Sequence, residues 1–196
     1  MKVARVISRL LHPIFTAPIA FFLTAYYAVG NLGIALQWTF FTFLVAELPP
    51  LLYLLSRVKK GKITDFDISL REQRPRVFAV SLASVIISLA VLALLGVPLV
   101  MVAAIVGAVV GMVVAAIITF YWKVSLHAVG VACFVSVALW LYGLIMLFAV
   151  LLLPLIGWAR AKVEAHTPAQ ILVGALIGFL IPIFVFFAFG IPLNFP

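Results

Sequence analysis

Apolar stretches of about bilayer length follow one another along the chain, and they constrain its fold more than any other feature. Hydrophobic residues make up 67% of the 196 residues, and charged residues only 9%. A soluble domain averages roughly half apolar and about a quarter charged residues. The chain is therefore predicted to be an integral membrane protein. The short alternating segments of a transmembrane barrel are not visible, so helices are expected to span the bilayer.

The apolar stretches divide into about seven expected spans, because a bilayer core takes about 20 helical residues. Residues 128–157 are too long for one span, and Tyr142-Gly143 in the middle indicates a hairpin of two helices. Pro49-Pro50 is expected to kink the second span. We predict an all-α, polytopic bundle of about six to seven transmembrane helices, forming one membrane domain over residues 1–196. The other five expected spans are Leu10–Val29, Ile34–Leu55, Val77–Leu95, Leu99–Tyr121 and Pro168–Gly190.

All basic residues fall on one predicted side of the membrane. With seven spans, the segments before the first span and after the second, fourth and sixth share that side, and they hold all 13 Lys and Arg residues. The positive-inside rule makes this side cytoplasmic and the protein a cell-membrane protein. The net charge is +8, but the charges lie at membrane borders. Anionic headgroups or a phosphate substrate are therefore expected as partners, and nucleic acid is not.

The segment around His166 combines charge, an imidazole and a helix start. Thr167 suits a cap, Pro168 the first helical position, and Gln170 completes a capping box. His166 precedes this helix at the positive end of its dipole, where anions bind favourably. Arg160 offers a fork of donors for phosphate oxygens. A membrane-border histidine with a snorkelling arginine is the other interpretation of these residues alone.

A second imidazole, His127, stands at a similar position. Lys123 and Ser125 precede it at a polar step between two predicted spans, and Ser125 can cap the helix that follows. The chain has three histidines, and these two fall at helix starts on one predicted side. An ionisable residue at membrane level is a functional candidate.

The loop between the second and third spans is the third polar segment. Ser69 and Glu72 form a capping-box pattern for a short turn, and Pro75 is expected to begin the third span. Arg71 and Arg74 share a face if that turn is helical. Both are candidates for binding an anion, whereas residues 57–62 are interpreted as a solvated charged loop.

Together the three segments resemble the type 2 phosphatidic acid phosphatase (PAP2) superfamily of membrane lipid phosphatases, over a core at about residues 57–190. That family shows a Lys, six residues and Arg-Pro; then Pro-Ser-Gly-His; then Ser-Arg, five residues, His, three residues and Asp. In the same order, this chain has Arg74-Pro75, then Ser125 and His127, then Arg160 and His166 with the family's spacing.

The chain departs from the family at several positions. Asp67 stands in place of the lysine, Leu126 in place of a glycine and Ala159 in place of a serine. Gln170 replaces the aspartate that would orient the nucleophilic histidine and increase its basicity. Two predicted spans also separate the first signature from the second, where family members usually have none.

The resemblance implies a phosphatase that acts on a lipid phosphate or an isoprenoid (di)phosphate, without a metal or cofactor. His166 would attack phosphorus, His127 would protonate the leaving oxygen, and Gln170 would contact His166. Arg160 and Arg74 would hold the phosphoryl oxygens. Candidates to complete the phosphate site and replace the missing lysine are Lys123, Lys62 and Arg71, with Ser125 beside them.

Two other functions remain open at this stage. Asp65 and Asp67 could hold Mg²⁺ for a lipid-diphosphate transferase. The loss of the family's aspartate and lysine instead favours a non-catalytic lipid-phosphate binder or transporter. Two residues have no assigned function. Glu47, the only acid within a span, either pairs with an arginine or lines a substrate cleft, and His12 is interpreted as a helix start.

Overall fold

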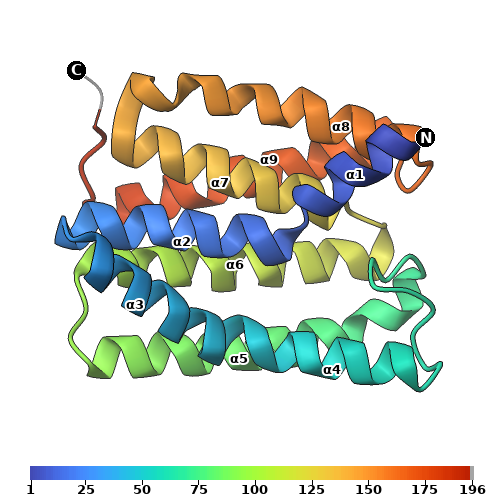
Figure 1. The fold of residues 1–196 in the computed structure, drawn as a ribbon, viewed down its shortest axis with the longest axis horizontal. Helices are drawn as coiled ribbons and strands as arrows, with labels where there is room; N and C mark the ends of the chain where they lie inside the picture. Colours follow the sequence, from blue (N-terminus) through green and yellow to red (C-terminus); the bar gives the residue numbers. More distant parts are fainter. Residues whose placement is uncertain (195–196) are drawn as a thin grey trace.

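The computed structural model describes residues 1–194, and the protein is 82% helical, with no strand in the described part. The predicted all-α, polytopic bundle is confirmed (Figure 1). Its elements, with η for π- and 3₁₀-helical segments, are α1 (Lys2–Leu10), α2 (Pro13–Val29), α3 (Leu32–Thr42), η1 (Phe43–Glu47), α4 (Leu48–Lys59), η2 (Arg71–Gln73), α5 (Arg74–Leu94), α6 (Leu99–Tyr121), α7 (Leu126–Tyr142), η3 (Gly143–Leu151), α8 (Leu152–Lys162) and α9 (Pro168–Ala188).

Five helical segments of the described chain are long and apolar enough to cross a membrane, or six if the pair α1 and α2, bent by 40°, is one span. One of the five, Leu126–Lys162, turns back on itself as α7 and the η3–α8 arm (Figure 1). Gly143 makes the turn with a φ of 65°, which glycine adopts without steric cost. Counted as two arms, this hairpin brings the passes to the predicted six to seven, and the architecture is consistent with an integral membrane protein.

The second span has a π-helical segment where a proline kink was predicted. Pro49 and Pro50 carry no amide hydrogen, so the α-helical hydrogen-bond ladder cannot continue through them. The helix widens over Phe43–Glu47, and the amide of Leu48 bonds five residues back, to the carbonyl of Phe43. The span therefore continues, with one widened turn, from Leu32 to Lys59.

Helices α7 and α9 make the most extensive helix–helix contact in the bundle. A Cβ atom at Gly174 would lie 2.6 Å from the carbonyl oxygen of Ser125, and one at Gly178 would lie closer still to that of Val129. These two glycines therefore allow the close packing of α7 against α9. The contact brings the first turns of α7 and α9, with their histidines, to the same end of the molecule.

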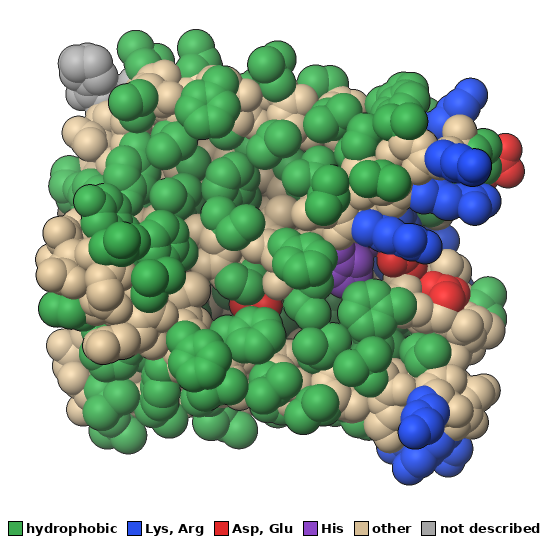
Figure 2. All heavy atoms as spheres, in the orientation of Figure 1, with side chains coloured by type: hydrophobic (Ala, Val, Ile, Leu, Met, Phe, Trp, Pro, Cys, Tyr) green, Lys and Arg blue, Asp and Glu red, His purple; other side chains and the backbone are tan. Residues whose placement is uncertain are grey.

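Charged side chains gather at one end of the bundle. Figure 2 shows Lys and Arg at the end that holds the N-terminus, near histidine and acidic side chains, while hydrophobic side chains cover most of the remaining view. The 40° bend between α1 and α2 turns α1 across this end, where it packs against α8. The functional candidates are found there.

Candidate functional site

Two polar segments meet at the starts of α7 and α9. The amide of Ser125 donates to the carbonyl oxygen of Gln170 over 3.3 Å, and Lys123 Nζ donates to that of Ala165 over 2.9 Å. Burial and the nearby arginines 74 and 160 lower the pKa of Lys123. Ser125 is fully buried and its hydroxyl accepts from the amide of Ala128 at 3.4 Å, so it caps α7 as predicted.

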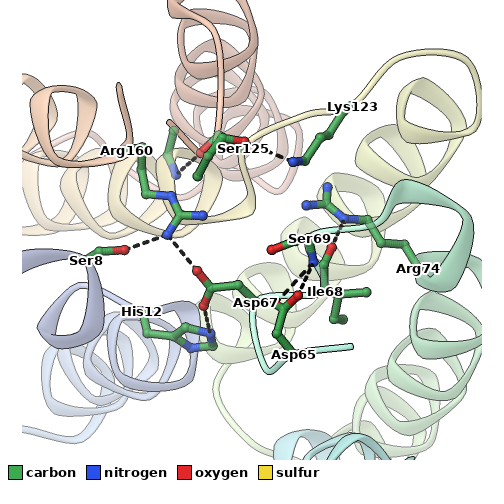
Figure 3. A network of polar contacts seen from close by, with 12 residues as sticks. Ser8, His12, Asp65, Asp67, Ile68, Ser69, Arg74, Lys123, Ser125 and Arg160 are labelled. Atoms are coloured by element: carbon green, nitrogen blue, oxygen red, sulfur yellow. Dashed lines mark hydrogen bonds and ion pairs between the residues drawn. The ribbon is translucent and has the colours of Figure 1, made fainter. Parts of the chain in front are cut away.

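Arg160, in the last turn of α8, is 3% exposed and joins three parts of the chain. Its Nη1 atom donates to Ser8 Oγ at 2.6 Å and to Asp67 Oδ2 at 2.8 Å (Figure 3). Its Nε–H has no acceptor among the described residues. The ion pair compensates the charge of this buried guanidinium, because a buried unpaired charge is costly.

Arg74 is 2% exposed and uses its guanidinium to hold backbone. Its Nε donates to the carbonyl oxygen of Ile68 at 3.0 Å (Figure 3). Its Nη1 donates to the carbonyl oxygen of Val124 at 2.8 Å. Pro75 lies in the first turn of α5, as predicted. The capping box predicted for Ser69 and Glu72 is wrong, because no side chain caps η2 and the amide of Ser69 instead donates to Asp65.

His166 is 8% exposed, and its Nδ1 lies 3.1 Å from Gln170 Oε1. The same oxygen accepts from the amide of Thr167 at 3.3 Å, which completes the predicted capping box. Since Oε1 is an acceptor, Nδ1 carries the proton and Nε2 keeps its lone pair in the neutral ring. Burial, with Lys123 and Arg160 nearby, lowers the pKa of His166 to about 3. The ring is therefore neutral near pH 7, in a nucleophilic tautomer.

His127 is 4% exposed, and its Nε2 has no hydrogen-bond partner among the described residues. Its ring lies 4.8 Å from that of His12, edge to face. An orphaned nitrogen in so buried a position is unusual, because most buried polar groups are paired. A ligand atom at this position would give it a partner.

The residues described above form a polar cluster at this end of the bundle, made up of Ser8, His12, Asp67, Arg74, Lys123, His127, Arg160 and His166. Sequence reasoning missed His12 and Ser8 as members of this cluster and assigned Asp67 only to a possible metal site. His12 is the predicted helix start, because its Nδ1 accepts from the amide of Ile14 at 3.2 Å. Its Nε2 lies 3.9 Å from Asp67 Oδ1, on the side of the carboxylate away from Arg160 (Figure 3). The available signal was that all three histidines stand at or beside a helix start.

A cavity of about 390 Å³ lies beneath this end of the bundle, between α2, α4, α5, α6, α7 and α9. Most of its lining is apolar. Its polar lining residues include His12, Asp67, Arg74 and His127 from the cluster, and Glu47 apart from them. Arg160, Lys123 and His166 do not line it. The volume is in the range of about 300–1,000 Å³ that is typical of small-ligand sites.

Ligand atoms of His12, Asp67 and His127 lie within 4.8 Å of one another, close enough to hold a metal ion. Two observations weigh against a cation there. His12 Nδ1 accepts a backbone hydrogen bond, so its neutral ring carries the proton on Nε2, the atom that faces Asp67. Arg160 already supplies a positive charge 2.8 Å from that carboxylate. The Asp65 of the alternative Mg²⁺ pair accepts from Ser69 within its own loop.

Two of the candidate phosphate-binding residues lie apart from the cluster. Arg71 Nη1 donates to the carbonyl oxygen of Tyr121 at 2.6 Å, and its Nε lies 3.5 Å from Glu72. Lys62 is exposed in the loop after α4. Their phosphate-binding roles stay predictions.

Comparison with protein-family models, with curated proteins and with solved structures finds no match for this chain. The resemblance to the PAP2 superfamily therefore stays a prediction, carried by the residues themselves.

Proposed function

We propose that the protein is a membrane phosphatase that hydrolyses a lipid phosphate or an isoprenoid (di)phosphate through a phosphohistidine, at the cytoplasmic face of the cell membrane. The observation that carries the proposal is a convergence at one end of the bundle. Two buried arginines, a lysine and two buried histidines from distant segments meet beside a largely apolar cavity. A phosphate and a hydrocarbon tail need this combination of surroundings.

The proposed chemistry uses the two histidines. Nε2 of His166 attacks phosphorus, and the bond from phosphorus to the lipid oxygen breaks. His127, as the imidazolium, gives the leaving oxygen a proton. Water then attacks the phosphohistidine, passes its proton to His127, and releases phosphate from His166. Each turnover restores both rings and consumes one water.

The cationic groups supply charge where the phosphoryl oxygens develop it. Arg160 donates through Nη1 to Ser8 and Asp67, and its buried Nε–H has no acceptor among the described residues. A bound phosphoryl group replaces Asp67 as the hydrogen-bond acceptor of the Arg160 guanidinium, because both groups offer anionic oxygen atoms. Lys123 and Arg74 add two further charges. These groups supply the positive charge that a metal ion provides in other phosphatases.

The test is phosphate release by the purified protein from phosphatidate, phosphatidylglycerophosphate and prenyl mono- and diphosphates, with and without EDTA. We expect release from at least one substrate, unchanged by EDTA. His166→Ala and His127→Ala should each lower it about 10²-fold or more, while Lys60→Ala, an exposed charge in the loop, should not. Release that requires added metal, or that survives both histidine substitutions, contradicts the proposal.

A lipid-phosphate binder without turnover is the second candidate. It is favoured by Gln170, which brings no charge to His166, and by the ion pair that already occupies Arg160. Binding of a lipid phosphate that depends on Arg160, with no phosphohistidine and no release, would establish this function in place of the first.

A further inference from the structure

One carboxyl group lies inside the cavity, away from the charged end. Glu47 is half-buried among apolar lining residues, and no hydrogen bond or ion pair joins it to another described residue. Figure 2 shows an acidic side chain recessed between hydrophobic ones, partway along the bundle. An acid at membrane depth is costly without a partner, so a polar partner within the cavity is expected.

The π-helical segment adds a second polar group beside this acid. In a regular α-helix, residues five apart point to different faces, since each residue turns the helix by about 100°. The extra residue of a π-turn brings such a pair onto one face. Thr42 and Glu47 stand in this relation across η1, and both line the cavity.

Thr42 itself lacks a partner. It is 4% exposed, and its hydroxyl makes no hydrogen bond within the described chain. Thr39, one turn earlier and outside the cavity lining, donates to the carbonyl oxygen of Ala35 at 2.7 Å. Thr42 therefore offers a buried hydroxyl without a partner on the cavity face.

The pair lies deeper in the cavity than the charged end. Leu54 packs with Ile63 and Ile68, the segment next to Asp67. Glu47 precedes Leu54 by two helical turns, about 10 Å along the axis. A ligand with its phosphate at the charged end and its chain in the cavity would thus pass Glu47 and Thr42.

We infer that the cavity takes a lipid phosphate whose backbone carries oxygen groups beyond the phosphate, as a glycerol-based lipid does, and that Glu47 and Thr42 bind its hydroxyl or ester oxygens. The inference rests on the proposed function for the position of the phosphate. A carboxyl and a hydroxyl can each accept a hydrogen bond, and the hydroxyl and a neutral carboxyl can donate one. A prenyl phosphate continues as hydrocarbon and leaves both groups unpaired, which disfavours it.

The experiment compares phosphate release from lysophosphatidate and from a prenyl monophosphate, in wild type and in variants that keep the charged end intact. Glu47→Leu and Thr42→Val should lower kcat/KM for lysophosphatidate about 10-fold or more, as a lost substrate hydrogen bond does. They should leave the prenyl substrate within about twofold. Glu47→Gln should retain most activity, because an amide also donates and accepts. Thr39→Val, on the same helix but outside the cavity, is the matched control.

Binding of a monoacylglycerol separates this inference from the proposed function, because that lipid carries the glycerol oxygens without a phosphate. It should raise the Tm of the wild type and of Thr39→Val, and not that of Glu47→Leu or Thr42→Val. Equal loss on both phosphate substrates, or no loss on either, overturns the inference. If no lipid phosphate is hydrolysed, the proposed function fails alone, and a Tm that does not respond to monoacylglycerol then overturns the inference as well.

Discussion

His127 and His166 occupy similar positions in the sequence and dissimilar ones in the structure. Each lies at the start of a helix whose first turn is capped by the hydroxyl of a preceding Ser or Thr. His166 is tied to Gln170 at 3.1 Å and lies outside the cavity lining. His127 lines the cavity and its Nε2 has no partner among the described residues.

The difference indicates separate roles for the two rings. His166 has a fixed tautomer with a free lone pair, which suits a nucleophile. His127 lines the cavity that a lipid would occupy and has an unpaired Nε2, which suits a proton donor to the leaving oxygen. Two positions that look alike in sequence therefore differ because of what packs against each ring.

The largest expected effect separates these roles by the leaving group. With a lipid phosphate, His127→Ala and His166→Ala should each lower kcat/KM by about 10²–10⁴-fold. The leaving group of p-nitrophenyl phosphate needs no proton. With this substrate, kcat/KM of His127→Ala should return most of the way to the wild-type value, while kcat/KM of His166→Ala should stay as low as with the lipid phosphate. The measurement is kcat/KM on both substrates. Equal recovery in the two variants would remove the assigned difference.

A smaller effect is expected from separating the two helix starts. In Gly178→Ala the new Cβ meets the carbonyl of Val129, and overpacking of this kind costs about 1–3 kcal/mol. Its Tm and phosphate release should both fall. Gly111→Ala is the matched control, because its Cβ would have 4.0 Å to the nearest atom. If both variants keep wild-type Tm and release, the close contact of α7 and α9 does not position the histidines.

The smallest change is Gln170→Glu, which keeps the capping box and places a carboxylate beside His166 Nδ1. The charge favours the imidazolium, so the pKa of His166 rises from its wild-type value of about 3 toward the usual 6.5. In the wild type, His166 binds a proton below about pH 6.5 in the unfolded state but only near pH 3 in the folded state. The stability of the fold therefore falls as the pH drops from about 6.5 toward 3.

In the variant, Tm should fall less than in the wild type as the pH is lowered. Phosphate release should be lost at a higher pH than in the wild type, because His166 is protonated at a higher pH. Profiles of Tm and release between pH 4 and 8 measure both, with Gln170→Ala as the variant that removes the contact without adding charge. Unchanged profiles in Gln170→Glu would mean that Gln170 does not set the protonation of His166.

Much of the fold could be predicted from the sequence, because it depends on local composition. Runs of apolar residues must form helices in a bilayer, since the backbone has no other way to satisfy its hydrogen bonds there. The hairpin at Gly143 and the capping box at Thr167 follow from residue types with strong backbone preferences. The helix start at His12 was predicted as well, but the 40° bend that turns α1 across the charged end was not.

The site was predictable only in part. Arg74, His127, Arg160 and His166 carry a spacing that can be recognised, and the structure brings them to one end of the bundle. Asp67 was noticed as a departure from a pattern and as a possible metal ligand. Its ion pair with Arg160 joins residues 93 positions apart, which no local rule anticipates.

The sequence by itself determined that this chain forms membrane helices and that its Lys and Arg residues lie at one end of them. It also determined that helices start at or beside the three histidines. Only the tertiary structure decided which imidazole lines the cavity, that Asp67 neutralises Arg160, and that Glu47 lies inside the cavity instead of pairing with an arginine. The physical reason is that helix formation depends on neighbours along the chain. Burial, ion pairing and exposure to a cavity depend on neighbours in space, which packing alone brings together.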